Sequence, residues 1–459
     1  MSLGSDMRQM SGQLELPFEG QGEAMPKERS DEARPATTES GRSGHDDEDL
    51  MARVVERNNV EAALRRVKSN KGSPGIDGMT VEELPGHLAK YWPLLREQLL
   101  AGTYLPKPVR RQTIPKSGGG VRELGIPTVL DRFIQQCVLQ VLQPRFDASF
   151  SQHSYGFRPG RSAHDAVNAA YHYVCQGRHW VVDVDLEKFF DRVNHDLLMG
   201  RLAKRFEDRR LLKLIRSYLK AGIMVSGVAM ERHEGTPQGG PLSPLLANVL
   251  LDEVDKELER RGHAFARYAD DCNVYVQSER AGQRVMQVLR RLYAKLRLRI
   301  NEAKSAVAPT WDRKFLGYRF LRPRNGLVKR GIARQALQAM KDRIRAITWR
   351  SGGRSLPVVI TQLRAYLLGW REYFQLVETP TILRDLDSWI RRRLRMLLLK
   401  QWHRPHTIYL KLRAAGLTPR KAAQVASGHG RWWYSAGSTI HIALPAHYFD
   451  KLGVPRLAS

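Results

Sequence analysis

Two adjacent aspartates, Asp270 and Asp271, interrupt the segment RYADDCNVYV (residues 267–276), which otherwise has the composition of a β-hairpin. Asp is depleted in strands, and neighbouring carboxylates repel each other when both are ionised. A bound cation removes this repulsion. The aspartate pair therefore indicates a site that is electrostatically unfavourable until it holds a positive ion.

A second group of carboxylates lies about 85 positions earlier, in WVVDVDLEKFFD (residues 180–191). Strand alternation places Asp183 and Asp185 on one face and apolar side chains on the other; these are Trp180, Val182, Val184 and Leu186. Hard divalent cations such as Mg²⁺ bind a few carboxylates together with substrate phosphates. Two such ions, roughly 3.5–4 Å apart, support phosphoryl transfer. The two segments together favour metal-dependent phosphoryl transfer.

The elements that must position these carboxylates can be predicted from hydrophobic periodicity and from Gly and Pro. Residues 51–70 have a helical pattern, residues 109–126 read as two short strands joined by a Gly-rich turn, and residues 131–146 read as a helix. Residues 235–262 combine a Gly/Pro loop with a long amphipathic helix, and residues 315–323 read as one strand. After about residue 330 the pattern is almost wholly helical.

Charge is the strongest global signal, because the net charge is +28. Residues 1–50 hold 12 acidic and 5 basic side chains, so the remainder carries +35. Neutralised phosphates release counterions, which makes a polyanion the expected partner of so basic a chain. We therefore expect nucleic acid binding by residues 51–459 and an acidic, disordered tail over residues 1–50.

Membrane and disulfide classes are disfavoured. No apolar run reaches the roughly 18 residues of a membrane span, and the start lacks a signal-peptide pattern. The three cysteines, Cys137, Cys175 and Cys272, form no CxxC pair, so we expect free, buried thiols. These features predict an intracellular protein with no membrane partner.

Seven ordered blocks carry a resemblance to a known family. The chain resembles the reverse transcriptases of the bacterial group II intron maturase family, and most of all its compact class C members, over roughly residues 51–450. The blocks are IPKSGGGVRELGIPTVLDRFIQQ, SYGFRPGRSAHDAV, VVDVDLEKFFDRVNHD, EGTPQGGPLSPLLANVLLDEVDKEL, RYADDCNVYV, LRINEAKSAV and FLGYRF.

The resemblance implies an α+β right-hand polymerase in three parts. Fingers and palm with an antiparallel sheet span residues 51–329, and an all-α thumb or maturase domain spans residues 330–415. A short DNA-binding region follows over residues 416–459, without the paired cysteines of an HNH endonuclease.

The catalytic residues are implied in the same way. In this family the first catalytic carboxylate lies five positions before an aromatic residue that packs under the sugar, and Phe190 fits that aromatic, which selects Asp185 over Asp183. Asp185, Asp270 and Asp271 then form the triad for two Mg²⁺ ions, with Mn²⁺ as an alternative. Phe190 excludes a 2′-hydroxyl by size, so deoxynucleotides are favoured.

Further contacts with nucleotide and nucleic acid are implied by the same blocks. Lys116 and Arg122 match the basic pair that grips the incoming triphosphate, Gln238 matches the residue against the incoming sugar and base, and Lys304 lies near the phosphates. The residues matched to template and primer contacts are Arg158, Gly160, Asn301, Leu316 and Gly317.

The helical arm is expected to hold the template–primer duplex through phosphates and shape. In its most basic segment, DSWIRRRLRMLLLKQWHR (residues 387–404), basic residues are interspersed among apolar ones. The basic residues are Arg391, Arg392, Arg393, Arg395 and Lys400. For the aromatic side chains of Trp370, Tyr373 and Phe374, packing between helices is favoured over base stacking.

The resemblance implies an RNA-directed DNA polymerase that copies an RNA template from a DNA or RNA primer with dNTPs. It also implies binding of group II intron RNA to assist splicing, and of target DNA in retrohoming, as a ribonucleoprotein in the bacterial cytoplasm. The sequence leaves open the oligomeric state, the identity of the RNA and the way that synthesis is primed.

Three alternatives compete with this interpretation. One is an RNA-binding splicing factor with little polymerase activity, against which the intact aspartates and Gln238 argue. Another is a domesticated reverse transcriptase in DNA repair or host defence, which stays open because activity and biological role are separable. The third is an RNA-dependent RNA polymerase, which Phe190 and Ala269 disfavour.

Overall fold

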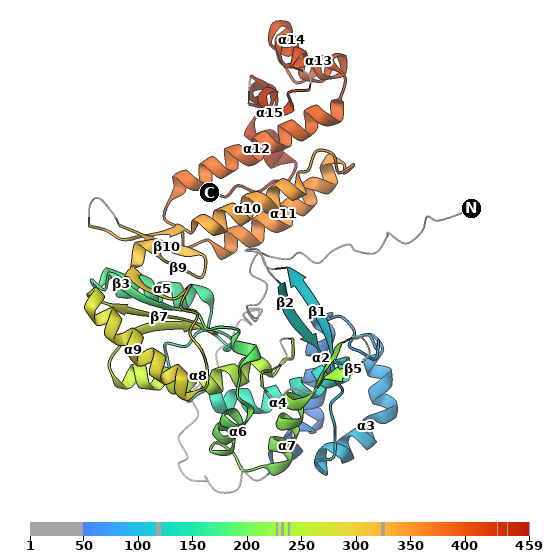
Figure 1. The fold of residues 1–459 in the computed structure, drawn as a ribbon. Coiled ribbons are helices and arrows are strands. Elements are labelled where there is room, and N and C mark those ends of the chain that lie inside the picture. Colours follow the sequence, from blue (N-terminus) through green and yellow to red (C-terminus); the bar gives the residue numbers. More distant parts are fainter. Residues whose placement is uncertain are drawn as a thin grey trace, which may run out of the picture. The chain divides into compact units, whose positions relative to one another are not determined.

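The computed structural model describes residues 49–115, 121–225, 228–230, 234–236, 239–322, 326–428, 430–437 and 439–458. The chain divides after Arg313 into two units (Figure 1), which we call the first unit (described from residue 49 to 313) and the second unit (residues 314–458). The predicted acidic tail over residues 1–50 lies almost wholly outside the described residues, as do Lys116 and Gln238.

The first unit mixes helices with two four-stranded sheets. In chain order its elements are α1 (Leu50–Val54), α2 (Arg57–Ser69), α3 (Leu84–Leu100), β1 (Val109–Pro115), β2 (Val121–Ile126), α4 (Val129–Asp147), α5 (Ala163–Cys175), β3 (Trp180–Val184), η1 (Phe189–Asp191), α6 (His195–Ala203), α7 (Arg209–Lys220), β4 (Ile223–Val225), β5 (Val228–Met230), α8 (Ser243–Arg260), β6 (Ala264–Tyr268), β7 (Asp271–Val276), α9 (Glu279–Lys295), β8 (Ala306–Pro309) and η2 (Thr310–Asp312).

The sheet that carries the aspartates has the strand order β6-β7-β3-β8, and all its pairs are antiparallel. Val182 pairs with Val274 on one side and with Val307 on the other. Helix α9 packs against this apolar face so closely that a Cβ on Gly282 would lie 2.4 Å from the Val307 side chain. The predicted alternation in β3 is confirmed, because Val182, Val184 and Leu186 are buried in the core.

The other sheet has the strand order β2-β1-β4-β5. The two strands predicted over residues 109–126 are confirmed as the antiparallel pair β1–β2, with Arg110 opposite Ile126 and Pro115 opposite Val121. The joining residues, 116–120, lie outside the described residues. β1 also pairs in parallel with β4.

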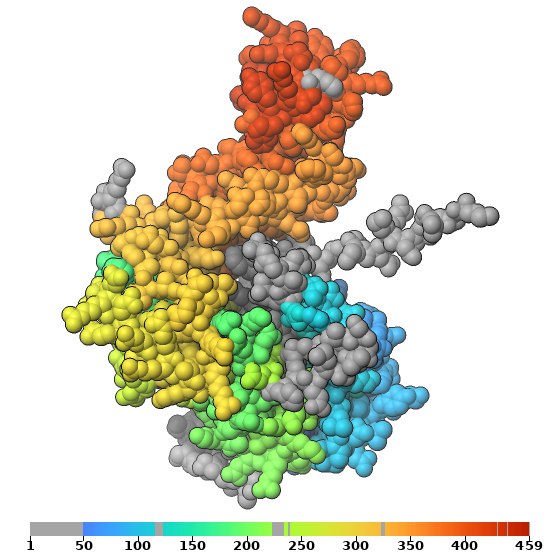
Figure 2. Space-filling view, viewed as in Figure 1, coloured from blue at the N-terminus to red at the C-terminus, as the bar shows by residue number. Residues whose placement is uncertain are grey.

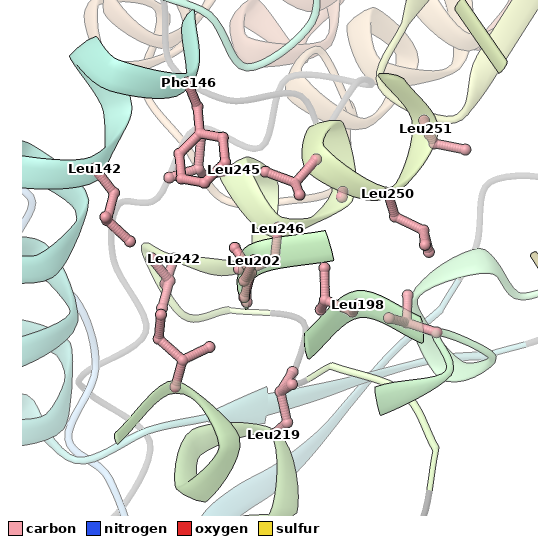
Figure 3. Packing of buried hydrophobic residues seen from close by; sticks show 14 of the residues in the cluster. Leu142, Phe146, Leu198, Leu202, Leu219, Leu242, Leu245, Leu246, Leu250 and Leu251 are labelled. Atoms are coloured by element: carbon pink, nitrogen blue, oxygen red, sulfur yellow. The ribbon is translucent and has the colours of Figure 1, made fainter. Parts of the chain in front are cut away.

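Leucines from four helices pack together in the first unit's core (Figure 3). They are Leu142 of α4, Leu198 and Leu202 of α6, Leu219 of α7, and Leu245, Leu246, Leu250 and Leu251 of α8. The helices predicted over residues 131–146 and in the second half of residues 235–262 are confirmed as α4 and α8. The helical stretch at residues 51–70 is broken at Val55 and Glu56 into α1 and α2, so its apolar residues do not form one continuous helical face.

The second unit has a small sheet followed by helices. Its elements are β9 (Lys314–Phe315), β10 (Tyr318–Leu321), β11 (Lys329–Ile332), α10 (Arg334–Ile347), α11 (Leu356–Tyr373), α12 (Pro380–Trp402), α13 (Pro405–Ala414), α14 (Pro419–Ser427), α15 (Trp432–Ser435), α16 (Ile440–Ala443) and α17 (Ala446–Lys451). The helical pattern predicted after residue 330 is confirmed, as is the packing role of Trp370 and Phe374, which are both 3% exposed. Figure 2 shows the surface of this unit in orange to red.

The single strand predicted over residues 315–323 is wrong. FLGYRF forms a hairpin instead, in which Phe315 of β9 pairs with Tyr318 of β10. Leu316 and Gly317 make the turn with φ values of 50° and 77°. Two-residue hairpin turns need such left-handed residues, and a leucine in this conformation is not visible in the hydrophobic pattern. Tyr373 stabilises the turn by donating from Oη to the Leu316 carbonyl at 2.9 Å.

The arginines of α12 make contacts within the second unit that the sequence did not predict, and their role with the duplex stays a prediction. Arg391 pairs with Asp387 at 2.8 Å and with Asp450 at 2.9 Å. Arg392 lies 4.2 Å from the ring centre of Trp433. Arg393 donates to Thr348 Oγ1 at 2.6 Å, and Arg395 donates to the Leu444 carbonyl at 2.8 Å. These arginines therefore tie α12 to the end of α10 and to the C-terminal helices.

Two expectations from composition can be compared with the described residues. None of the helices in the described ranges combines the length and the apolarity that crossing a bilayer requires. All three thiols are free, but only Cys137 and Cys272 are buried, whereas Cys175 is exposed. Burial raises the pKa of the Cys272 thiol, which keeps it protonated and inert.

Candidate active site

The aspartate pair lies at the turn between β6 and β7. Tyr268 pairs with Asp271, so Ala269 and Asp270 form a two-residue turn. Ala269 has a φ of 56°, at a turn position that glycine usually takes. The surrounding structure must hold this strained alanine in place. The hairpin predicted from RYADDCNVYV is confirmed.

The register between β3 and β7 brings Asp185 to the same place. Val184 pairs with Cys272, so the next residue, Asp185, lies opposite Asp271, and directly opposed residues in antiparallel strands have Cα atoms about 4.5–5.5 Å apart. The Asp185 main chain is fixed on both sides, because its N–H donates to Ser305 Oγ at 3.0 Å and its carbonyl accepts from the Asn301 N–H at 2.8 Å. Asn301, predicted to contact nucleic acid, thus has a structural role through its main chain.

A lysine lies beside the first carboxylate. Lys304 Nζ is 3.6 Å from Asp185 Oδ2, and both side chains reach solvent, with exposed fractions of 65% and 43%. A surface pair of this kind contributes little to stability. Lys304 can therefore leave Asp185 and bind another anion at small energetic cost.

Asp183 has a different environment from Asp185. It accepts hydrogen bonds from Arg313 at 2.7 Å and 2.6 Å, and its side chain is only 14% exposed. The guanidinium neutralises Asp183, and both of these contacts are made to its Oδ2. Asp185 consequently keeps the more accessible carboxylate of the two.

The donor set fits a divalent cation in chemistry and in backbone placement. Asp185, Asp270 and Asp271 offer hard oxygen donors at the open end of one sheet. Among the described residues, however, no three side chains of Asp, Glu, His or Cys are already gathered closely enough to hold a metal. The three carboxylates would have to adjust their side chains on a fixed backbone to share an ion.

Phe190 follows Asp185 on a short, ordered connection. Lys188 has a φ of 48°, which turns the chain into the 3₁₀ helix η1, and the Phe189 and Phe190 rings pack edge to face with centres 5.1 Å apart. The Phe190 carbonyl accepts from the Thr236 N–H at 2.7 Å. Phe190 is half-buried against the core, so its ring is held by the protein and is not a mobile surface group.

Of the residues predicted to bind the nucleotide, only some lie in the part of the chain that the structure describes. Arg122 lies in β2 opposite Ile114, whereas Lys116 and Gln238 lie outside the described residues. The glycines after Gln238 do allow a close approach, because a Cβ on Gly239 would lie 3.0 Å from the Gly125 carbonyl and one on Gly240 would lie 2.3 Å from Gln135 Oε1. These contacts place Gly239 beside β2 and Gly240 beside α4.

Two family models match consecutive parts of the chain. The reverse transcriptase (RNA-dependent DNA polymerase) model matches residues 114–320, and the group II intron maturase-specific domain matches residues 337–415. Protein YkfC of Escherichia coli (strain K12) is 34% identical over 319 residues, which cover 60% of this chain and 84% of YkfC. This chain belongs to the group II intron reverse transcriptase and maturase family. The predicted family, the α+β class and the enzyme class, RNA-directed DNA polymerase, are thereby confirmed.

Other relatives match over shorter stretches. The group II intron-encoded protein LtrA of Lactococcus lactis is 37% identical over 195 residues, or 42% of this chain and 32% of LtrA. Among solved structures, a partial Cas6-RT-Cas1--Cas2 complex aligns at a TM-score of 0.35 and 29% identity, over 54% of this chain and 42% of that one. The predicted class C subtype and the predicted domain boundaries stay predictions.

The residues that this group II intron reverse transcriptase was predicted to use for template and primer have varied surroundings. Arg158 is 7% exposed, and its guanidinium binds inside the protein, to Asp147 Oδ1 at 2.7 Å and to the Ser154 carbonyl at 2.9 Å. Gly160 has a φ of 66° with open space around it. Leu316 and Gly317 form the β9–β10 turn in the second unit. Their contact with nucleic acid stays a prediction.

Two residues beside the aspartates received no role from the sequence. Gly156, in SYGFRPGR, lies against the Ala269 turn, and Arg267, the first residue of RYADD, is buried beneath it. A buried arginine in a strand can be suspected only from its position among apolar residues. Gly156 is not part of a left-handed turn, the usual reason to predict an essential glycine, because its φ is not positive. The residue that it contacts, Ala269, is more than a hundred positions away in the chain.

Proposed function

We propose that this reverse transcriptase copies RNA into DNA at the site formed by Asp185, Asp270 and Asp271, adding dNTPs to a DNA or RNA primer. The register of β3 and β7, which sets Asp185 opposite Asp271 beside the Asp270 turn, is the observation that carries the proposal. The family as a whole uses divalent metal ions; for this chain we propose Mg²⁺, with Mn²⁺ as the alternative.

We propose a separate role in the reaction for each of the chain's own residues. Asp185, Asp270 and Asp271 would hold two ions, which supply Lewis acidity for deprotonating the primer 3′-hydroxyl and for neutralising the departing pyrophosphate. The main-chain bonds of Asp185 to Asn301 and Ser305 keep its carboxylate in register with the hairpin. Lys304 would exchange Asp185 for the incoming phosphates, and Phe190 would pack under the sugar of the nucleotide.

Lys304→Gln should raise the KM for dNTP by about 10-fold. This is the lower end of the effect expected from a charge-assisted hydrogen bond of about 1.5–3 kcal/mol, because the lysine is 65% exposed. Steady-state extension of a short primed RNA measures this, with Lys68→Gln on the exposed side of α2 as the control. A variant with unchanged KM for dNTP would show that Lys304 serves Asp185 alone.

Phe190→Ala should raise the use of ribonucleotides relative to deoxynucleotides by about 10- to 100-fold, as expected when steric exclusion of one small group is lost. Single-nucleotide incorporation of each dNTP and its rNTP partner gives the ratio of kcat/KM values. Phe190→Tyr keeps the ring and should keep the discrimination. If Phe190→Ala still rejects ribonucleotides, another residue is the gate.

We further propose that the chain binds group II intron RNA to assist splicing, binds target DNA in retrohoming, and works in the bacterial cytoplasm as a ribonucleoprotein. The maturase-specific match at residues 337–415 and the net charge of +28 support this proposal. The relatives' names give it context, since LtrA is an intron-encoded protein.

Binding of intron RNA should weaken steeply with salt. We expect log Kd to change linearly with log salt, with a slope of about 0.7–0.9 per neutralised phosphate. Filter binding from low to moderate potassium chloride measures the slope, and a polyanionic competitor such as heparin provides a control for general charge effects. A flat response would contradict the charge argument.

The proposed polymerase is tested by dNTP incorporation on a primed RNA template, with Mg²⁺, Mn²⁺ or a chelator. Extension that requires a divalent ion supports it. Folded protein that binds RNA without extending a primer would favour the splicing-factor alternative instead. An assay of intron splicing in the same preparation, with and without the protein, separates these two outcomes.

A further inference from the structure

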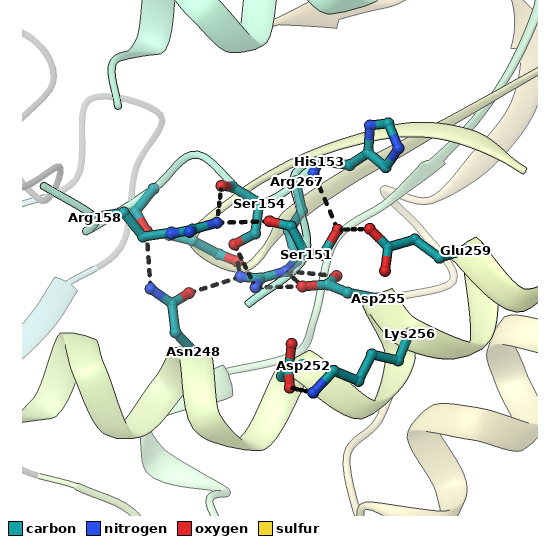
Figure 4. A network of polar contacts seen from close by, with 12 residues as sticks. Ser151, His153, Ser154, Arg158, Asn248, Asp252, Asp255, Lys256, Glu259 and Arg267 are labelled. Atoms are coloured by element: carbon teal, nitrogen blue, oxygen red, sulfur yellow. Dashed lines mark hydrogen bonds and ion pairs between the residues drawn. The ribbon is translucent and has the colours of Figure 1, made fainter. Parts of the chain in front are cut away.

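Arg267, labelled in Figure 4, is a buried arginine of β6, the strand that leads into the turn with Asp270. Arg267 of β6 is 1% exposed, and its guanidinium donates to Asp255 of α8 through Nε and Nη2 at 2.6–2.9 Å. It also donates to Ser154 Oγ at 2.7 Å and to Asn248 Oδ1 at 2.9 Å. Residues from α8, from the loop after α4 and from β6 thus meet at one side chain.

The same guanidinium reaches the catalytic turn. Arg267 Nη1 donates to the Ala269 carbonyl at 2.8 Å. That carbonyl belongs to the same planar peptide unit as the N–H of Asp270. The hydrogen bond therefore fixes the orientation of the peptide plane from which the Asp270 main chain departs. It also holds Ala269 in its left-handed conformation, with φ of 56°.

A second residue, Gly156, also contacts the turn. Gly156 lies so close that a Cβ on it would be 2.2 Å from the Ala269 nitrogen. Asn248 holds this glycine by donating from Nδ2 to its carbonyl at 2.9 Å, while its Oδ1 accepts from Arg267. Asn248 thus couples the arginine to the segment that presses on the turn.

The buried charge is compensated by its partner. Asp255 is fully buried and its Oδ2 lies 2.6 Å from Arg267 Nη2. Burial raises the pKa of the Asp255 carboxyl, and the guanidinium opposes that rise. A hydrophobic pair could fill this volume at little cost in stability. A guanidinium has five donors in a rigid fork, however, and one of them is used on the turn itself.

We propose that Arg267 is a positioning residue for polymerisation: it fixes the Ala269–Asp270 peptide so that the Asp270 carboxylate meets Asp185 and Asp271 in a geometry that a divalent ion can use. The inference rests on the proposed function for its effect on catalysis. Its structural part, the rigidity of the turn, stands apart from that function.

Two variants test the proposal, because a single deletion would leave Asp255 as an unpaired buried charge. Arg267→Lys keeps the positive charge beside Asp255 but lacks the planar fork that reaches Ala269. The double variant Arg267→Met with Asp255→Leu removes both charges together. The control is Arg391→Met with Asp387→Leu, which removes an ion pair of the second unit whose side chains are 2% and 14% exposed and leaves Asp450 paired with Arg456.

Each variant is measured in three ways. Hydrogen exchange of residues 264–276 is followed in the metal-free protein. Primer extension gives kcat and the Mg²⁺ concentration for half-maximal extension, and a binding assay gives the Kd for primed template. We expect both Arg267 variants to exchange faster at the turn, to need about 10-fold more Mg²⁺, and to lose about 10- to 100-fold in kcat, since misplacement by about 1 Å has effects of this size. The Kd for primed template should stay within twofold.

The control pair should leave hydrogen exchange of the hairpin and the Mg²⁺ requirement at wild-type values. Folded Arg267 variants with wild-type exchange at the turn and an unchanged Mg²⁺ requirement would overturn the proposal. Loss of kcat together with weaker template binding, without faster exchange at the turn, would also overturn it. If wild type extends no primer, the proposed function fails, and the exchange experiment still decides whether Arg267 holds the turn.

Discussion

Asp270→Asn is expected to lower RNA-templated dNTP incorporation by about 10³-fold or more. The amide keeps the size of the side chain but removes the negative charge with which Asp270, at the turn between β6 and β7, is proposed to bind a metal ion. Folding should be little affected, because the residue is half-exposed and removing one of two adjacent carboxylates relieves repulsion. Primer extension on RNA, with thermal melting of the same preparations, measures both properties.

Asp183→Asn is the comparison that tests the choice of carboxylates. Asp183 lies on the same face of the chain, two residues before Asp185, but it is already paired with Arg313. We expect this variant to keep extension within about tenfold of wild type, since it alters a supporting ion pair and not a metal ligand. If Asp183→Asn abolished extension while Asp185→Asn did not, the assignment of the first carboxylate would be wrong.

Gly156→Ala is the second variant with a large expected effect, although the residue has no chemistry of its own. The added Cβ would lie 2.2 Å from the Ala269 nitrogen and 2.9 Å from the Tyr268 carbonyl carbon. Both are main-chain atoms, so no flexible side chain can yield. The turn must move by about 1 Å to restore van der Waals contact, and a displacement of that size lowers kcat by about 10²-fold.

Gly200→Ala is the matched control for this change. Gly200 lies inside α6 of the same unit, and a Cβ there would meet nothing within 4 Å. Alanine is favoured over glycine inside a helix by about 0.5–1 kcal/mol, so this variant should melt at the same or a higher temperature and extend primers normally. Wild-type kcat in folded Gly156→Ala would show that the close approach does not position Asp270.

The sequence by itself determined the elements that carry the chemistry. Period-two alternation separated the apolar residues of β3 from Asp183 and Asp185, and two aspartates between strand-forming segments marked the hairpin. The ordered blocks identified the family, which the matches at residues 114–320 and 337–415 confirm. These signals are local, because alternation and turn chemistry depend on neighbours along the chain.

Local patterns failed where the conformation departed from residue preference. Leu316 takes a left-handed φ of 50° and turns the expected strand into a hairpin. No propensity predicts a leucine there, since the cost of this conformation is offset by the pairing of β9 with β10 and by the bond from Tyr373. The break between α1 and α2 was likewise invisible in the periodicity.

Only the tertiary structure decided which partners the charged side chains take. Long Arg and Lys side chains reach whichever acceptor the fold brings near, so composition predicts their number but not their use. Arg313 neutralises Asp183 across 130 positions, Arg267 binds Ser154 across 113, and Arg395 of α12 binds the Leu444 carbonyl across 49. The aspartates could be recognised in the sequence because strand geometry is local. The contacts that hold them in place come from distant segments, which meet only when the core has formed.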